Sequence, residues 1–423
     1  MKHPLAFLLV VLAPIVAAQE APLTIQRAVE LALARNERAA IAETTVEAAE
    51  ARVRRARTAF FPRVDISGNL SGNYRSGAGN GTERNLSTSA QLTQPIFDAR
   101  AFPLYRQQRF ARDAVRLTAG ESKRLLGFDA AAAFLGVLSA EQVLLAAQHR
   151  RDFAQANLTD VRARFEAGLV SSNDVTRAEL ELATAVRGVA QATGDVQATR
   201  IDLGTLLKAD ASAPLAPPEE LLAAAAASPA LSEGALAEAQ QRRGDIAALR
   251  AEVEAQRAFA EEPNARFLPS VGLTARTSNL NDGAITNRNN EGFVGLSFGW
   301  PVFDAGVRGA ERAERTAELR GIELQLELEL RGVERELRGA AVQLSTEQAA
   351  LREAAAALRA ARKNSEETGI LYREGLASAL ELADATQRLF EAEVAEVTAR
   401  YQMALAYLSV REASGVEPVG ETR

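Results

Sequence analysis

The sequence contains no cysteine and only two histidines among its 423 residues. Disulfides and thiol catalysis are therefore excluded, and two histidines leave too few ligands for most zinc sites. Lysine occurs only at positions 2, 123, 208 and 363, so arginine carries nearly all of the positive charge. Arginine and glutamate alternate along the chain, the net charge is −6, and we find no basic stripe set apart from acidic residues. We expect no nucleic-acid binding, no metal and no cofactor.

Long hydrophobic runs are also scarce. The run from Leu5 to Val16 follows Lys2 and His3 and ends in small residues, a pattern typical of a signal peptide over residues 1–18. Its 12 residues are too few to cross a bilayer, which takes about 20. No cysteine follows that could carry a lipid, and we find no apolar stretch of about 18 residues in the rest of the chain. We expect an exported protein without a transmembrane helix, so that any membrane span must be β.

What the chain does contain is a duplication. Three short motifs return in the same order at an offset of about 207 residues: 60–64 as 267–271, 94–99 as 300–305, and 164–169 as 371–376. A repeat of this length indicates one whole structural unit made twice. We predict a first unit at 19–210, a proline-rich linker at 211–231, a second unit at 232–415 and a flexible tail at 416–423.

Each unit begins with a helical pattern, which in the first runs from 24 to 58, and continues with a predicted β-hairpin, at 62–96 and at 268–302. Apolar and polar residues alternate strictly in these segments, as in Val64, Ile66 and Leu70 against Asp65 and Ser67. The strands have the length of tilted membrane strands, and Trp300 lies where an interfacial aromatic residue belongs.

After each hairpin the helical period continues unbroken over 99–166 and over 305–374. At 1.5 Å per residue each helix reaches about 100 Å. Leucines recur at every seventh position from Leu330 to Leu358, which predicts supercoiling against neighbouring helices. Gly168 and Gly375 interrupt the two helices, and we predict helical hairpin tips at 166–172 and 373–379.

Four amphipathic strands cannot close into a barrel, because small membrane barrels need about eight. Open strand edges are not tolerated in lipid, where each unpaired backbone group costs several kcal/mol. Several chains must therefore pool their strands, and strand counting alone does not choose between a dimer and a trimer. The expected fold is mainly α with membrane β: a shared barrel and a long helical conduit.

The duplicated plan, the Pro-Val/Ile-Phe-Asp motif at the strand ends and the Phe-Glu-Ala-Gly-Leu-Val turn resemble the TolC family of outer membrane efflux proteins. The likeness spans roughly residues 22–415. It implies a homotrimer in outer membrane lipid, with a twelve-stranded β-barrel and a helical tunnel through the periplasm. It also implies docking onto a periplasmic adaptor protein of an inner-membrane transporter, and no enzyme activity.

The resemblance further implies candidate residues at the periplasmic entrance. Glu381 and Asp384 match carboxylates that constrict the entrance in the family, and threefold symmetry would bring six of them together. Such crowding should raise some of their pKa values and favour cations. The alternative is a solvated helix face on which Asp384 pairs with Arg388.

Tyr372 and Asp174 match partners in the polar network that closes the entrance in the family. The family's arginine two residues past the second tip glycine is replaced here by Ala377, which puts that lock in doubt. The expected adaptor-docking residues are those of the two tips: Gly168, Leu169, Val170, Gly375, Leu376 and Ala377.

Two other interpretations of the sequence compete with an outer membrane channel. A periplasmic coiled-coil adaptor or structural protein would account for the long helices, but it would not need two hairpins of membrane length. An exported hydrolase would need a nucleophile and a base, which histidines at positions 3 and 149 do not supply. The sequence identifies neither the exported substrate nor the pump.

Overall fold

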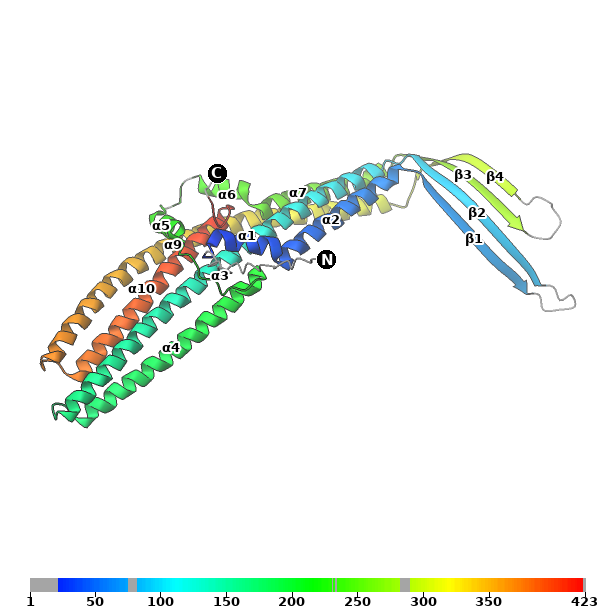
Figure 1. Ribbon diagram of the computed structural model, residues 1–423. Helices are drawn as coiled ribbons and strands as arrows, with labels where there is room; N and C mark the ends of the chain where they lie inside the picture. Colours follow the sequence, from blue (N-terminus) through cyan, green and yellow to red (C-terminus); the bar gives the residue numbers. More distant parts are fainter. Residues whose placement is uncertain (1–21, 75–81, 230, 233, 282–289, 421–423) are drawn as a thin grey trace, which may run out of the picture.

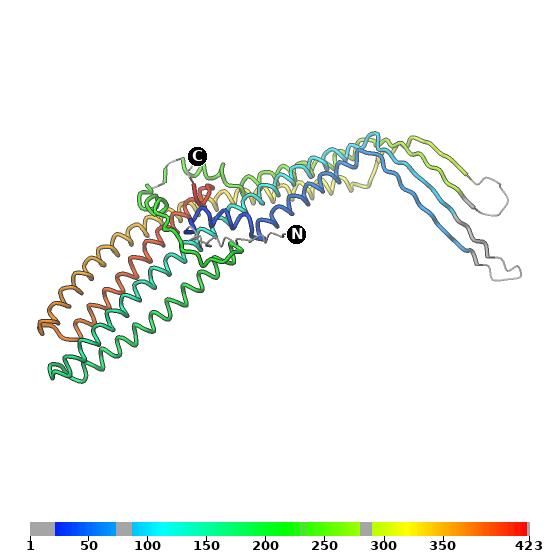
Figure 2. Tube along the Cα trace, in the orientation of Figure 1, coloured from blue at the N-terminus to red at the C-terminus, as the bar shows by residue number. Residues whose placement is uncertain are grey.

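The computed structural model describes residues 22–74, 82–229, 231–232, 234–281 and 290–420, so the expected signal peptide lies outside the described residues. The molecule is a long array of helices with a four-stranded sheet at one end and two helical hairpin tips at the other (Figure 1). The sheet extends away from the helices instead of folding back on them (Figure 2). Neither face of the sheet is covered by a long helix of the described chain.

The sheet is antiparallel, with the strands in the order β1-β2-β3-β4. The strands span Arg63–Tyr74 (β1), Thr82–Phe97 (β2), Ser270–Asn281 (β3) and Asn290–Gly299 (β4). Both predicted hairpins are confirmed. Pairing of β2 with β3 joins the two repeats into one continuous sheet.

One face of this sheet is apolar across all four strands. Val64 pairs with Leu92, which pairs with Ala275, which pairs with Val294. The neighbouring row on the opposite face is polar and consists of Arg63, Thr93, Thr274 and Gly295. Because side chains alternate along a strand, the predicted two-faced sheet is confirmed. Its apolar face is left in the open, as the 71% exposure of Leu296 shows.

Two helical hairpins form the rest of the length. The first consists of α3 (Ala101–Glu166) and α4 (Ser172–Leu207), and the second of α9 (Val307–Arg373) and α10 (Ala379–Ala413). With 66 and 67 residues, α3 and α9 are each about 100 Å long, as expected. The predicted heptad seam is seen in α9, where Leu337 and Leu344 are buried.

The helical pattern at 24–58 forms two helices, α1 (Ile25–Arg35) and α2 (Glu37–Arg57), because Asn36 interrupts it. The Asn36 side-chain oxygen accepts from the backbone N–H of Arg38 at 2.9 Å, which caps α2. The side-chain amide of Asn36 donates to the carbonyl of Leu206 at 3.0 Å, which fixes the break against α4.

In the second repeat, α7 (Gly244–Ala260) takes the place that α2 has in the first. Next to the sheet, α2 packs on α3, α3 on α7, and α7 on α9. Short one-turn helices, η1 (Thr58–Phe60) and α8 (Glu262–Ala265), connect α2 and α7 to the strands. Each strand pair is therefore supported by its own pair of helices.

The main hydrophobic core lies in the middle of the molecule, where α1, α3, α4 and α10 meet. Its members are apolar side chains fully withdrawn from solvent, among them Ile25, Leu126, Phe134, Leu135 and Leu203. Residues far apart in the sequence, from the start of the first unit to the last helix of the second, thus form one core.

Two segments are more ordered than their composition indicates. The expected linker at 211–231 includes the helix α5 (Glu219–Ala227), which buries Leu221 and Ala225, and the helix α6 (Ala235–Arg242) follows it. The expectation of a flexible tail is wrong for residues 416–420, because Arg124 and Arg411 donate to backbone carbonyls there. Residues 421–423 lie outside the described chain.

The expectation that the mature chain lacks a long apolar stretch is also wrong. One described helix, α3, contains an 18-residue window with a mean hydropathy of 1.7. By length and composition it meets the criterion for a membrane-spanning helix. However, 44% of that window is buried inside the chain, and α3 packs against α1, α2, α4, α7 and α10. The buried part of this window belongs to the main hydrophobic core, which includes Leu126, Phe134 and Leu135.

Candidate functional site

The first helical tip is a tight turn built around a left-handed glycine. Gly168 has φ +73°, and the backbone N–H of Leu169 donates to the carbonyl of Arg164 at 2.8 Å, which closes the end of α3. Ser171 and Asp174 then form a capping box at the start of α4. The predicted tip at 166–172 is therefore a tight turn, hydrogen-bonded to the end of α3 and capped at the start of α4.

The second tip repeats this geometry. Gly375 has φ +77°, the N–H of Leu376 donates to the carbonyl of Leu371 at 2.8 Å, and Ser378 forms a capping box with Glu381. Leu169 and Leu376 are each 75% exposed at the extreme end of the molecule. Two equivalent apolar side chains thus project from the tips.

The Glu381 carboxylate accepts its hydrogen bonds from the N-cap residue of its own helix, α10. It accepts from the backbone N–H of Ser378 at 2.7 Å and from the Ser378 hydroxyl at 2.9 Å. These hydrogen bonds, the backbone one foremost, hold the pKa of Glu381 below its ordinary value. Within one chain this is the opposite of the rise expected from crowding. Asp174 has the same capping role in the first tip.

Asp384 forms the ion pair that the solvated-face alternative describes. Its carboxylate accepts from Nε of Arg388 at 2.8 Å, and both side chains are largely exposed. An exposed pair of this kind contributes little stability, so Asp384 is available for other contacts.

Tyr372 lies in the interior of the tips and is only 7% exposed. It packs with Val161, Ala178 and Leu382, and the Arg164 guanidinium lies 5.3 Å from its ring centroid. Its hydroxyl has no hydrogen-bond partner among the described residues. Burial raises the pKa of Tyr372.

The structure does not join Tyr372 to Asp174 by a hydrogen bond; the Asp174 carboxylate accepts instead from the backbone N–H and the hydroxyl of Ser171. Ala377 packs against the cluster that contains Tyr372, and its methyl group offers the Tyr372 hydroxyl no hydrogen-bond partner. With alanine at position 377, the Tyr372 hydroxyl has no hydrogen-bond partner among the described residues. This agrees with the doubt whether the polar network of the family forms in this chain.

The sequence did not indicate a groove between the two hairpins just behind the tips. This cavity of about 350 Å³ is lined by α3, α4 and α10 and includes Phe153, Leu180 and Leu380. Asp174 and Arg177 supply charge at its edge. Apolar groups exposed at helical spacing are the only sequence signal for it.

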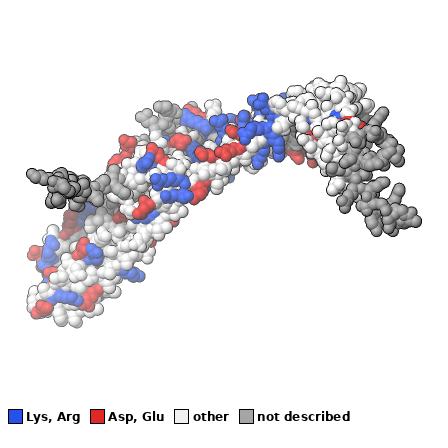
Figure 3. All heavy atoms as spheres, turned by 45° about the vertical axis from the view of Figure 1, so that its right-hand side comes forward, with Lys and Arg blue, Asp and Glu red and all other residues white. Residues whose placement is uncertain are grey.

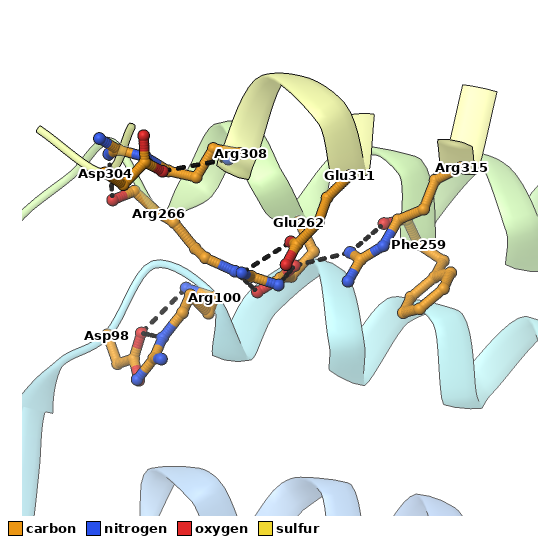
Figure 4. Close-up of polar contacts among 9 residues, drawn as sticks. All are labelled: Asp98, Arg100, Phe259, Glu262, Arg266, Asp304, Arg308, Glu311 and Arg315. Carbon is orange, nitrogen blue, oxygen red and sulfur yellow. Dashed lines mark hydrogen bonds and ion pairs between the residues drawn. The ribbon is translucent and has the colours of Figure 1, made fainter. Parts of the chain in front are cut away.

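At the opposite end, the duplicated Pro-Ile-Phe-Asp and Pro-Val-Phe-Asp motifs begin the two longest helices. Asp98 accepts from the backbone N–H of Arg100 at 3.0 Å, and Asp304 accepts from that of Arg308 at 3.0 Å (Figure 4). Each aspartate also pairs with the side chain of the same arginine. The motif is thus the device that turns a strand into a helix.

Beside that turn in the second repeat, side-chain hydrogen bonds join α8 to α9. Glu262, only 3% exposed, accepts from Nε of Arg266 and from Nη1 of Arg315, each at 2.6 Å (Figure 4). Burial raises the pKa of Glu262, but the two arginines outweigh it and hold the pKa below its ordinary value. This network could not be predicted, because arginine and glutamate alternate throughout these helices.

Charge is distributed unevenly over the surface. Basic and acidic side chains are mixed along the helices, basic ones gather over the helix ends next to the sheet, and the described sheet carries little charge (Figure 3). A surface with low charge and exposed apolar side chains at one end fits insertion into lipid.

Comparison with known proteins agrees with this geometry. The model of the family described as outer membrane efflux protein matches residues 28–207 and 235–416. Outer membrane protein TolC of Escherichia coli is 23% identical over 401 residues, which cover 87% of this chain and 77% of TolC. Alkaline protease secretion protein AprF of Pseudomonas aeruginosa is 26% identical over 341 residues, covering 78% of this chain and 69% of AprF.

Solved structures show the same fold. CusC superposes with a TM-score of 0.81 at 19% identity, covering 93% of this chain and 92% of CusC. The open state of the MtrE outer membrane channel of Neisseria gonorrhoeae superposes with a TM-score of 0.79 at 19% identity, covering 94% of this chain and 91% of MtrE.

These matches decide between the readings of the sequence. The periplasmic adaptor reading is not supported, since the match covers both repeats with their hairpins and the superposed folds are outer membrane channels. The chain belongs to the outer membrane efflux protein family, and it is a non-enzymatic outer membrane channel, reaching into the periplasm, of a tripartite efflux or type I secretion system.

Proposed function

We propose that three copies of this chain form one passage from the periplasm to the cell exterior. The observation that carries the proposal is the sheet itself: four strands with one apolar and one polar face, both uncovered in a single chain. Three such sheets supply twelve strands, enough to close a barrel with a polar interior, and closure leaves no edge in lipid.

The helices next to the sheet support the same side-by-side assembly of chains. Next to the sheet each chain contributes α2, α3, α7 and α9 as neighbours, so that α2 and α9 lie at the edges just as β1 and β4 do. The same neighbouring chain that extends the sheet therefore also extends the layer of helices. Exposed apolar residues on α9, such as Leu324 and Leu328, are available for that contact.

The hairpin tips form the periplasmic entrance and the contact with the pump assembly. The adaptor of an inner-membrane transporter docks on the exposed leucines and the glycine turns: Gly168, Leu169, Val170, Gly375, Leu376 and Ala377. Glu381 and Asp384 line the entrance, with Tyr372 and Asp174 behind them. The supporting observation is that Asp384, 57% exposed with a solvated partner, and Glu381 face outward on the first turns of α10.

Assembly is tested by electrophoresis of the outer membrane fraction with and without heating. We expect an oligomer three times the mass of the chain that dissociates on heating, and detergent should be needed to extract it. Recovery of the mature protein as a soluble monomer from periplasmic extract would rule the assembly out.

The entrance is tested in planar bilayers with the Glu381→Ala/Asp384→Ala variant. We expect a changed single-channel conductance and weaker block by divalent cations, because a carboxylate ring concentrates cations. Ser378→Ala is the matched control, since it removes the hydroxyl of the same cap and leaves both carboxylates. Unchanged conductance and block in the double variant would remove these residues from the constriction.

A further inference from the structure

A cavity of about 590 Å³ lies where the first repeat passes from helix to strand. It is bounded by the end of α2, the start of α3 and the base of β1 and β2. Three arginines line it, Arg52 and Arg55 from α2 and Arg63 from β1, and its lining includes no aspartate or glutamate. The amides of Gln107 and Gln108 add hydrogen-bonding groups.

These arginines belong to a segment that has no acidic residues, contrary to the expectation that arginine and glutamate alternate along the whole chain. Between Glu50 and Asp65 the chain has five arginines and no acidic residue. Arg52 and Arg55 are exposed, and neither makes an ion pair with a described residue, whereas Arg63 pairs with Asp65 at 2.7 Å. Two of the arginines that line the cavity therefore have no counter-charge among the described residues of one chain.

The cavity opens on the polar side of the sheet. Arg63 and Thr93 are cross-strand partners in the polar row, and both line it. The aromatic cluster of Phe60, Phe102 and Tyr105, with ring centroids 5.2 and 5.9 Å apart, is not part of the lining. In a membrane barrel the polar side of the strands faces the lumen.

The second repeat shows that this basic character is not a requirement of the fold. At the offset that relates Phe60 to Phe267, Arg55 corresponds to Glu262. Glu262 is buried and paired with two arginines, so its position serves a structural purpose. Arg55 makes no ion pair with a described residue, and it lines the cavity.

We propose that Arg52, Arg55 and Arg63 form a binding site for the anionic group of a solute in the channel, such as a carboxylate, sulfate or phosphate, where the helical conduit meets the barrel. The site faces the lumen only in the assembled channel, so this inference rests on the proposed trimer. Guanidinium groups bind such oxyanions through paired, charge-assisted hydrogen bonds. Threefold symmetry places three copies around the passage, which favours anions there.

The test uses the full-length protein in planar bilayers of zwitterionic lipid, with inorganic pyrophosphate as the probe. An ionic strength of about 0.1 M leaves a Debye length of about 10 Å, so the charges are not fully screened. We expect pyrophosphate to block the wild-type current. The Arg52→Gln/Arg55→Gln variant should need about tenfold more, because one charge-assisted hydrogen bond is worth about that factor. The reversal potential in a salt gradient should shift toward cation selectivity.

Arg54→Gln/Arg57→Gln is the matched control, because it removes the same charge from the same helix at residues that do not line the cavity. Its block by pyrophosphate should stay within about twofold of wild type, because Arg54 and Arg57 do not line the cavity and form no hydrogen bond with the probe there, so that only the general field of the helix changes. An equal loss of block in both variants, or in neither, would overturn the site. Line broadening of the pyrophosphate ³¹P resonance by detergent-solubilised protein gives a second readout that needs no current.

The outcomes distinguish a failure of the proposed anion site from a failure of the proposed trimer. A wild-type protein that conducts but whose block is unaffected by the cavity variant refutes the site alone. A protein that never conducts refutes the proposed assembly, while the ³¹P broadening still decides whether the arginines bind the anion. Phospholipid that co-purifies with wild type but not with the cavity variant, with block unchanged, would assign the cavity to a lipid phosphate and overturn the inference.

Discussion

Glu262 accepts a hydrogen bond from Arg315 at 2.6 Å, and this contact ties the one-turn helix before β3 to α9, which follows β4. Both side chains are almost withdrawn from solvent. The bond therefore joins the two segments that flank the second β-hairpin. It helps to set the orientation of the sheet relative to the helices. A misdirected sheet could not align with its neighbours in a barrel.

Glu262→Gln should destabilise the chain by about 3 kcal/mol, because it removes a buried charge and leaves Arg315, which is largely withdrawn from solvent, without its counter-charge. Thermal unfolding of the detergent-solubilised protein, followed by circular dichroism, measures the loss. Glu47→Gln is the control, since Glu47 is exposed and makes no ion pair with a described residue. Equal stability of the two variants would show that the Glu262 network does not hold the junction.

The same carboxylate predicts a dependence on pH. Its pKa is lower in the folded chain than in the unfolded chain, where it is about 4.3. The unfolded state therefore binds the proton first, and the stabilisation is complete above that value and lost as the pH falls through the folded pKa. From about pH 5 downward the wild type should lose stability more steeply than Glu262→Gln. Parallel profiles would contradict this.

The duplicated elements could be predicted from the sequence because each leaves a strong periodic signal. The alternation around Val64 gave the strands, and the heptad through Leu337 gave the supercoiled α9. The tips could be placed because only glycine adopts the backbone of Gly168 and Gly375 without strain. Local patterns of this kind are read directly from side-chain spacing.

What could not be predicted depends on contacts distant in the sequence. Asn36 breaks a helix because Leu206 accepts its amide, and Arg411 orders the tail by donating to Gly420. A missed local signal is the Ser-x-x-Asp/Glu pattern at Ser171 and Ser378, which identifies Asp174 and Glu381 as capping residues. Asp174 and Glu381 thus have a structural role that the resemblance alone did not imply.

The tip glycines should respond to alanine in the opposite way from a glycine within a helix. Gly168→Ala forces a β-carbon into the left-handed region at a cost of about 1 kcal/mol. Hydrogen exchange at the Leu169 amide, which closes the turn, should then be about fivefold faster. Gly188→Ala in α4 meets no atom within 4 Å and should be neutral or stabilising. Unchanged exchange in Gly168→Ala would show that the turn tolerates a side chain.

The two faces of β4 should respond differently to charge. Leu296→Arg places a guanidinium on the apolar face, at a cost of about 2 to 4 kcal/mol at the bilayer midplane and less toward its surface. Ser297→Arg introduces the same residue one position later on the polar face, where water solvates it. Membrane-inserted oligomer, measured by heat-modifiable mobility, should fall only in Leu296→Arg. A comparable loss in Ser297→Arg would mean that the polar face does not line an aqueous lumen.

Ala377→Arg should close the entrance more firmly. Ala377 packs against the cluster that contains Tyr372, whose buried hydroxyl lacks a partner among the described residues. An arginine there would donate to that hydroxyl and to Asp174, and would thus link the two hairpins. We expect a lower single-channel conductance in planar bilayers and less uptake of large antibiotics by cells.

Two further variants separate this link from simple bulk. Ala377→Met adds a side chain of similar length without charge and should leave the conductance near that of wild type. Adding Tyr372→Phe to Ala377→Arg removes the acceptor, so part of the conductance should return, and the coupling in this cycle measures the link. If Ala377→Met lowers conductance as much as Ala377→Arg does, the effect is steric and the unpaired hydroxyl of Tyr372 plays no part in gating.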